Sequence, residues 1–282
     1  MTPEQLTCIK EHLFWNNVSV QPLSGGSCNE IYCLSHQGEN VVIKLADQRQ
    51  FPGLLLRERE GLAALRQTNT FHIPEILSYF EDNSTAFLCM EWISSTHSSA
   101  NSDQLFGQKL AELHQNTHTK FGWHTSNYIG SLLQNNSFTE SMAEFYIQNR
   151  LEPQFRMASQ KGFNFNRIDT LYTIVSSSTP AEPPALIHGD LWSGNAMVSA
   201  RGEPCLIDPA VSYASREMDI ALMKLFGGFG TTIFEAYQEV YPLACGWQDR
   251  ISLWQLYYYL VHVNLFGSSY ASSVQRCMDA YT

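Results

Sequence analysis

The chain has 282 residues, a length that fits one large enzyme or two lobes sharing a cleft, and its 44% hydrophobic and 16% charged content excludes a largely disordered protein. Its 17 basic and 27 acidic residues give a net charge of −10, which argues against a broad positive face for nucleic acid or membrane lipid. An anionic small ligand would need a local device, such as backbone N–H groups, a placed lysine or a metal ion.

The first 92 residues are rich in short segments typical of strands. A helix is predicted to begin after Thr2, because Pro3 suits the first turn and Gln5 completes a capping box. The next elements, in chain order, are strands around 18–23, 31–35 and 40–45, a helix over 54–65, and strands over 73–80 and 85–92.

Helical patterns dominate the rest of the chain. A Ser-rich segment at 94–102 is expected to lie on the surface, and Asp103 is the predicted N-cap of the following helix. Further helices are expected at about 139–160, 167–178, 218–240 and 249–266, with short strands at 185–188, 196–198 and 204–207. The sequence thus predicts an α+β fold with a small β-rich lobe (1–92) and a larger, mainly helical lobe (93–282).

The strongest chemical signal is LIHGDLWSGN at 186–195, followed by CLIDPA at 205–210. Asp190 and Asn195 are five residues apart, and Asp208 ends a second apolar run. In phosphoryl transfer, an aspartate in such a loop accepts the proton of the attacking hydroxyl, while an asparagine and a second aspartate hold Mg²⁺. Carboxylate and amide oxygens suit that ion. Turn chemistry would explain a single HGD, but it does not explain the whole arrangement.

Phosphoryl transfer also needs a phosphate-covering loop, a strand lysine and a helix glutamate upstream, and candidates occur in that order. Gly25 and Gly26 would let backbone N–H groups approach phosphate oxygens. Lys44 lies in an otherwise apolar strand. Either Glu58 or Glu60 on the next helix could pair with it, and Glu58 is preferred.

The strand FLCMEWI at 87–93 ends where the two lobes are expected to meet, so its backbone groups are candidates for hydrogen bonds to an adenine. The N-terminal lobe is therefore predicted to bind ATP. The residues predicted to contact the nucleotide are Gly25, Gly26, Ser27, Cys28, Asn29, Lys44, Glu58, Glu91, Trp92 and Ile93.

These motifs carry a family resemblance that covers nearly the whole chain. The sequence resembles the fructosamine kinase (ketosamine 3-kinase) family, in the aminoglycoside phosphotransferase-like branch of the protein-kinase-like fold. LWSGN, the following DPA, an Arg-Glu-x-Asp segment and LFGGF point to this family within the branch. The matching pieces include GGSCN, VVIK, REREGLAAL, FLCMEW, LAELH, FGW, HGDLWSGN and IDPAVSYASREMDIALMKLFGGF.

The resemblance implies a two-lobed kinase that uses ATP and Mg²⁺ to phosphorylate the sugar 3-hydroxyl of a ketosamine. The substrate would be a fructosamine or ribulosamine, as a small molecule or on a glycated protein, and the reaction would serve deglycation repair. The resemblance implies that Asp190 is the catalytic base, that Asn195 and Asp208 bind Mg²⁺, and that Lys44 and Glu58 orient the phosphates.

Four further predictions concern the surroundings of the catalytic loop. Asp219 is expected to brace the loop, and His188 to be a hydrogen-bonded structural histidine. Trp192 is expected to form an apolar wall against the sugar. Of the tyrosines at 257–259, most should lie in the core, with one a candidate for the substrate cleft.

Two alternative functions compete with this interpretation. The first is another small-molecule kinase of the same branch, acting on an aminoglycoside, a choline-like amine or a different sugar, and LWSGN argues against it. The second is a non-catalytic nucleotide-binding or scaffold protein. That alternative predicts loss of the chemical residues, yet Lys44, Asp190, Asn195 and Asp208 are all present.

The sequence also supports expectations about location and assembly. The seven cysteines are odd in number and contain no CxxC, and no targeting segment or membrane-spanning stretch is visible, so a cytoplasmic protein is expected. No nucleic-acid or membrane partner is expected. A monomer or homodimer is predicted, with the hypothesis that oxidation of Cys28, or an intermolecular disulfide through it, turns the enzyme off.

Overall fold

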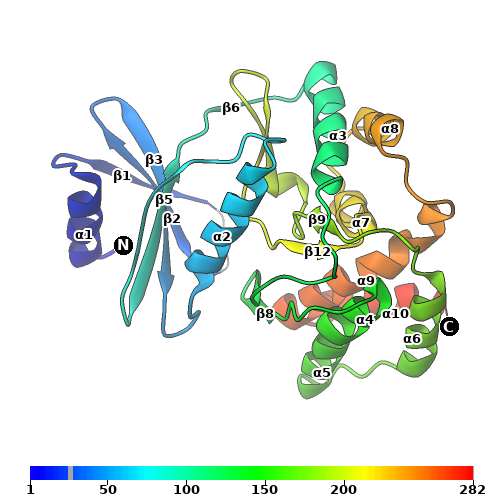
Figure 1. The fold of residues 1–282 in the computed structure, drawn as a ribbon. Coiled ribbons are helices and arrows are strands. Elements are labelled where there is room, and N and C mark those ends of the chain that lie inside the picture. The colour runs from blue at the N-terminus through cyan, green and yellow to red at the C-terminus, as the bar shows by residue number, and fades with distance from the viewer. Residues whose placement is uncertain (25–27, 282) are drawn as a thin grey trace.

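A computed structural model describes residues 1–24 and 28–281 of the chain. The molecule has two unequal parts, an antiparallel sheet flanked by helices α1 and α2 and a larger helical body (Figure 1). No helix in the described ranges is long and apolar enough to cross a membrane.

The predicted first helix is confirmed as α1 (Pro3–Leu13). Its capping box is present, because the Thr2 hydroxyl accepts from the Gln5 N–H at 3.2 Å and the Gln5 side chain accepts from the Thr2 N–H at 2.7 Å. Ile9 is the buried residue of this helix and packs against the sheet.

The sheet described for the N-terminal part has the strand order β1-β2-β3-β5-β4, with every neighbouring pair antiparallel. All five predicted strands are confirmed with small shifts at their ends. The strands are β1 (Ser19–Leu23), β2 (Glu30–His36), β3 (Glu39–Asp47), β4 (Ile76–Glu81) and β5 (Thr85–Glu91).

Strand alternation gives the central strand β3 two different faces. Ile43 and Leu45 belong to the core cluster that contains Ile9 of α1. Lys44 points to the opposite face, toward α2 (Leu54–Gln67), and Ala46 belongs to the cluster on that side. Because side chains alternate along a strand, Lys44 points away from α1 although its neighbours Ile43 and Leu45 face that helix.

The helical body contains α3 (Ala100–His114), α6 (Ile168–Ser178), α9 (Trp247–Phe266) and α10 (Ala271–Asp279). The predicted helix over 139–160 consists of α4 (Met142–Tyr146), a π-helical turn at Ile147–Leu151 and α5 (Glu152–Gln160). The short strands are β6 (Ser95–Thr96), β7 (Asn127–Ile129), β8 (Leu132–Gln134), β9 (Ala185–Ile187), β10 (Ala196–Ser199), β11 (Pro204–Leu206) and β12 (Ser212–Ala214).

Two boundary predictions were wrong. The segment 218–240 is not one helix but α7 (Glu217–Phe226) and α8 (Thr231–Val240), because Gly227 and Gly228 adopt positive φ values of 70° and 87° that end the first helix. The N-cap of α3 is Ser99 rather than Asp103, since the Ser99 hydroxyl accepts from the Ser102 N–H at 3.3 Å.

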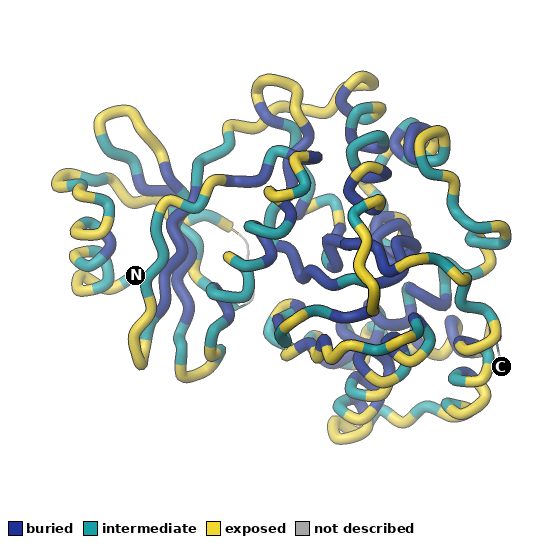
Figure 2. The backbone as a smooth tube through the Cα atoms, viewed as in Figure 1, coloured by how far each residue is buried: buried dark blue, intermediate teal, exposed yellow. Residues whose placement is uncertain are grey.

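One apolar cluster continues from the sheet into the helical body. Leu62 of α2 and Leu88 of β5 belong to the same cluster as Leu110 of α3 and Ile220 of α7. In Figure 2 the buried residues, drawn in dark blue, occur both in the sheet and in the helical body. The sheet ends at Glu91, while the division into domains 1–92 and 93–282 stays a prediction.

Helices α3 and α8 approach each other closely at Gly107. A Cβ at this position would lie 2.1 Å from the Ile233 carbonyl oxygen and 2.9 Å from the Ala236 Cβ. Only a residue without a side chain allows this packing.

We therefore predict that Gly107→Ala lowers the free energy of unfolding by about 2–3 kcal/mol, because α8 must move to relieve the overlap. Urea unfolding followed by circular dichroism measures the change. Gln104→Ala, on an exposed position of the same helix, should differ from wild type by less than about 0.5 kcal/mol. Equal stability of Gly107→Ala and wild type would contradict the packing argument.

Candidate active site

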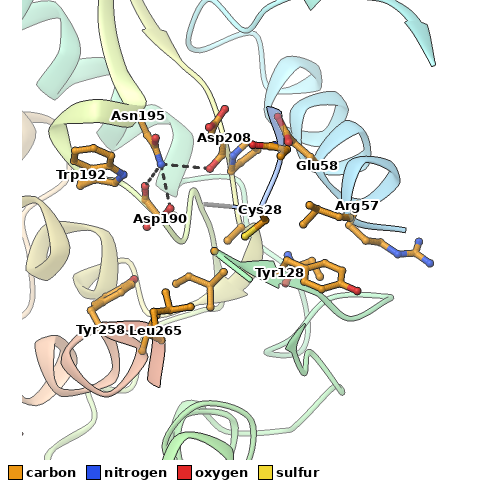
Figure 3. A pocket seen from close by; sticks show the side chains of 18 of the residues that line it. Cys28, Arg57, Glu58, Tyr128, Asp190, Trp192, Asn195, Asp208, Tyr258 and Leu265 are labelled. Carbon is orange, nitrogen blue, oxygen red and sulfur yellow. Dashed lines mark hydrogen bonds between the residues drawn. The ribbon is translucent and has the colours of Figure 1, made fainter. Parts of the chain in front are cut away.

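A cavity of about 560 Å³ lies between the sheet and the helical body, and Figure 3 shows its side chains. Lys44 and Glu58 come from β3 and α2. Asp190, Asn195 and Asp208 come from two loops of the helical body. Residues far apart in the sequence therefore line one cleft, as the motif spacing predicts.

Lys44 is the cation of this cluster and is only 3% exposed. Its Nζ donates to Glu58 Oε1 at 2.6 Å and also contacts Asp208 Oδ1. Burial alone would lower the pKa of Lys44, but the two carboxylates hold it above its ordinary value. The lysine therefore stays charged although it is buried.

The structure decides between the two glutamates on α2. Glu58 makes the ion pair with Lys44, whereas Glu60 pairs with Arg57 at 2.9 Å. Burial raises the pKa of Glu58, against the lowering effect of the Lys44 charge. The two glutamates are two positions apart, so they lie on different faces of the helix.

Asp190 lies in the loop between β9 and a short 3₁₀ turn at Ser193–Asn195. The Asn195 amide donates to the Asp190 backbone oxygen at 2.8 Å and to its carboxylate at 3.1 Å, as Figure 3 shows. Gly189 has φ 82°, and a Cβ there would lie 2.1 Å from the Ala210 oxygen. The motif glycine is thus required by close backbone packing.

The Asp190 carboxyl is partly buried beside other acidic groups. Burial, followed by the nearby charge of Asp208, raises its pKa from 3.8 to about 7, while the hydrogen bond from Asn195 lowers it. A carboxyl with this pKa exchanges a proton near neutral pH, which suits a group that accepts one during a reaction.

Asp219 on α7 holds the backbone of the loop. Its two oxygens accept from the N–H groups of His188 at 2.7 Å and Gly189 at 2.9 Å, and His114 Nε2 lies 3.3 Å away. The predicted structural histidine is also fully buried. His188 Nε2 lies 2.9 Å from the Ile207 oxygen, and burial lowers the pKa of the ring.

His114 and Tyr258 are supporting residues that the sequence did not single out for these contacts. His114 ends α3, and its side chain also contacts the Tyr237 hydroxyl at 2.9 Å. The Tyr258 hydroxyl donates to the Gly189 oxygen at 3.2 Å, and its side chain lines the cavity. Tyr258 is the cleft-facing tyrosine among residues 257–259. The sequence could not distinguish Tyr258 from Tyr257 and Tyr259, because all three residues are tyrosines. Their different packing in the fold does.

Asn195 and Asp208 have the chemistry of a site for Mg²⁺. The Asn195 nitrogen donates to Asp190, so the Asn195 amide oxygen is the atom that would face a metal ion. Asp208 has φ 56°, an uncommon value for a residue other than glycine, and its side chain is one-third exposed in the cavity.

These oxygen donors fit Mg²⁺, and the mutual repulsion of Asp190 and Asp208 favours a cation between them. In the described ranges, no group of three or more His, Cys, Asp and Glu side chains forms a metal cluster. Water and phosphate oxygens would therefore complete the shell.

Three more of the predicted site residues line the cavity. Trp192 lines the cavity, is 43% exposed and covers Gly194, where a Cβ would lie 2.1 Å from the Trp192 ring. Cys28 and Asn29 also line the cavity. Gly25, Gly26 and Ser27 lie outside the described residues.

The expected adenine-binding segment lies at the end of β5. The Glu91 side chain accepts from the Glu75 N–H at 3.1 Å and lies 3.2 Å from His72 Nε2. Glu91, Trp92 and Ile93 are not among the described residues that line the cavity. Their contact with a nucleotide stays a prediction.

Comparisons with known proteins agree with these motifs. The family model described as fructosamine kinase matches residues 2–282. The chain is 37% identical over 272 residues to a protein of Enterococcus faecium named "Probable ketoamine kinase", covering 94% of this chain and 96% of that protein. It is 33% identical to a chloroplastic protein-ribulosamine 3-kinase of Oryza sativa subsp. japonica, covering 93% of this chain and 78% of that protein.

Solved structures are similar over the whole chain. A crystal structure from Haemophilus somnus 129PT, provisionally named fructosamine-3-kinase, superposes with a TM-score of 0.88 at 27% identity, covering 97% of this chain and 95% of that one. An aminoglycoside phosphotransferase solved with AMP-PNP and hygromycin B has a TM-score of 0.66 at 15% identity, covers 100% of this chain and 98% of that one, and shares the fold alone. The predicted two-lobed, protein-kinase-like α+β fold is confirmed.

The contacts of Asp219 lead to a prediction about stability. We expect Asp219→Asn to lower the free energy of unfolding by about 2 kcal/mol, because an amide has one acceptor oxygen and sets its NH₂ group against a backbone N–H. Urea unfolding measures the loss. Asp279→Asn, on the exposed end of α10, is the matched control and should leave stability nearly unchanged. An equal effect of the two substitutions would refute the bracing role.

The raised pKa of Asp190 predicts how stability depends on pH. Between its unfolded value of 3.8 and its folded value of about 7, the folded protein holds more protons than the unfolded chain. Stability therefore falls as pH rises through this window, by about 1.4 kcal/mol for each pH unit between the two values.

Asp190→Asn removes the titrating group, so this variant should gain stability relative to wild type as pH rises from 5 to 8.5. Urea unfolding in metal-free buffer at several pH values tests this expectation, with Asp279→Asn as the control. A stability difference that stays constant across the range would show that the Asp190 pKa is not raised.

Proposed function

Because the chain belongs to the fructosamine kinase family, we propose that it transfers the γ-phosphoryl group of ATP to the sugar 3-hydroxyl of a ketosamine. The acceptor is a fructosamine or ribulosamine, carried by a small molecule or by a glycated protein, and the reaction serves deglycation. One observation carries the proposal. Lys44 contacts both Glu58 and Asp208 in a cavity that also holds Asp190 and Asn195.

Asp190 is the proposed proton acceptor. Its carboxyl lines the cavity, and a pKa of about 7 means that a large share of the molecules carry the ionised form at neutral pH. The hydrogen bond from Asn195 orients the carboxylate oxygen, and the bonds from His188 and Gly189 to Asp219 hold the loop in place. The substrate hydroxyl would lose its proton to Asp190 as it attacks the phosphorus atom.

Lys44 is the proposed phosphate-binding cation. It is buried and held by Glu58 from α2, so its ammonium group has little freedom to leave the cavity. Asp208, the second acceptor of the lysine, comes from the helical body. A placed lysine supplies a local positive charge in a chain of net charge −10.

Nucleotide and metal complete the proposal. The loop that contains Gly25, Gly26, Ser27, Cys28 and Asn29 would cover the phosphates, and the backbone at Glu91–Ile93 would meet the adenine. Asn195 and Asp208 would hold Mg²⁺, which when bound supplies positive charge against the phosphate oxygens. The partly exposed Cys28 and Asn29 in the cavity wall support this placement.

The alternative acceptors are less well supported. Aminoglycoside phosphotransferases share the fold at 13–15% identity, whereas the family match covers residues 2–282. A non-catalytic role would leave no reason for the arrangement of Lys44, Asp190 and Asp208 around one cavity.

The location and the assembly are also proposals. A cytoplasmic setting is supported by the free thiols of Cys8, Cys33, Cys89, Cys205, Cys245 and Cys277, which suit a reducing compartment. The protein would be a monomer or homodimer. A redox-linked dimer through Cys28 is supported by the partial exposure of that residue at the cleft.

The function is tested by incubating the protein with Mg-ATP and a panel of fructosamines, ribulosamines, an aminoglycoside and choline. We expect phosphate only on the ketosamines, and phosphorus NMR of the product should locate it on the 3-hydroxyl. Phosphorylation of only the aminoglycoside or choline would overturn the proposal.

Asp190→Asn should lower kcat on the ketosamine by about 10²–10⁴-fold, because the variant has no carboxylate to accept the proton. Binding of ATP, measured by calorimetry, should change little, since the nucleotide is held by other residues. Asp279→Asn serves as the control and should keep full activity. Turnover at the wild-type rate by Asp190→Asn would rule out the proposed base.

A further inference from the structure

The cleft has a second end whose chemistry differs from that of the catalytic cluster. One face of α9 lines it, because the cavity residues Tyr258, Val261, His262 and Leu265 follow the spacing i, i+3, i+4 and i+7. Phe226, the last residue of α7, lies opposite His262, with their ring centroids 4.9 Å apart. Tyr258 and Leu265 appear below the catalytic loop in Figure 3.

We define the apolar wall as Phe226, Val261, His262, Leu265 and Phe266. None of these cavity-lining residues carries a permanent charge. His262 Nδ1 lies 2.8 Å from the Tyr258 backbone oxygen, and burial lowers the pKa of the ring, so the imidazole is neutral near pH 7. The wall therefore offers hydrocarbon and aromatic surface rather than ions.

Two aromatic side chains of the wall are exposed. Phe226 is 43% exposed and Phe266 is 57% exposed, and Trp192, which lines the same cavity, is 43% exposed. Among the described residues, these three are a third of the nine large hydrophobic side chains that are exposed, yet all three line this one cavity. Exposed apolar surface gathered in a cavity marks a place where an apolar group binds.

The wall is connected to the loop of Asp190 through Tyr258 and Gly228. The Tyr258 hydroxyl reaches the oxygen of Gly189, the neighbour of Asp190, at 3.2 Å. Gly228, two residues after Phe226, packs against Ser193 of the catalytic loop, where a Cβ would meet the Ser193 side chain at 2.6 Å. His262 follows Tyr258 by one helical turn, about 6 Å along the axis.

From this geometry we infer that the apolar wall is the subsite for the substituent on the amine nitrogen of the ketosamine, and that it selects apolar alkyl or aryl substituents over polar ones. The inference rests on the proposed function. A ketosamine carries its amine on C1 and its reacting hydroxyl on C3 of the same sugar, so a sugar placed at Asp190 directs the substituent away from the phosphates. The wall is an apolar surface of the same cavity that adjoins the Asp190 loop through Tyr258, and it would receive the substituent.

The same apolar chemistry can come from a small amine or from the hydrocarbon stem of a glycated lysine. The experiment therefore uses three ketosamines with the same fructosyl group, formed on ethanolamine, on benzylamine and on Nα-acetyl-lysine. Dissociation constants from calorimetry and kcat/KM values from turnover are both measured, so the subsite is tested even if no phosphate is transferred.

With wild-type protein we expect the benzylamine adduct to bind and react at least about tenfold better than the ethanolamine adduct, mainly through a lower KM. The double variant Phe226→Ala, Phe266→Ala should reduce this preference to about twofold. Phe226→Leu should keep most of the preference, because the wall stays apolar.

Phe138→Ala is the matched control, since Phe138 is 44% exposed but lies outside the cavity, and it should keep the full preference. A lysine adduct as good as the benzylamine adduct would assign the subsite to lysine stems, and a poorer one would assign it to small amines. Equal affinities of wild type for the benzylamine and ethanolamine adducts, or a preference that survives in the double variant, would overturn the inference. Selective binding without any phosphate transfer would instead refute the proposed function and leave the subsite intact.

Discussion

The buried ammonium group of Lys44 is the constraint on which the site depends. A charge with 3% exposure is tolerated only when it is paired, and here two carboxylates pair with it. One belongs to α2, and the other lies 164 residues away in the helical body. The contact therefore links the sheet to the loop of Asp208, so loss of Lys44 would leave the nearly buried Glu58 and the partly exposed Asp208 without their shared cation.

Three residues at the start of α7, its N-cap Arg216 and the first-turn residues Glu217 and Asp219, make further contacts of this kind. Arg216 pairs with Glu182 at 2.5 Å, and Glu217 pairs with Arg250 at 2.6 Å. Asp219 accepts the two N–H groups of the catalytic loop. The loop that carries Asp190 is therefore held from outside by Asp219 as well as from within by Gly189 and Asn195.

The two ends of the cleft differ in chemistry, one charged and the other apolar. At one end lie acidic groups and a lysine, where burial and then the charge of Asp208 raise the pKa of Asp190. At the other end, the apolar wall has exposed rings but no permanent charge. A substrate with a polar sugar and an apolar amine substituent would match both ends, whereas a purely polar sugar would leave the wall in contact with water.

The sequence by itself determined the local structure and the residues of the candidate site, because caps, strand alternation and motif spacing are short-range properties. It identified Asp190, Asn195 and Asp208, the capping box at Thr2 and the strand that carries Lys44. Tertiary packing decided that Glu58 and not Glu60 meets Lys44, and that Tyr258 reaches the catalytic loop. It also assembled the apolar wall from the end of α7 and one face of α9. These contacts join segments distant in sequence, and no local pattern encodes which faces of two helices will meet.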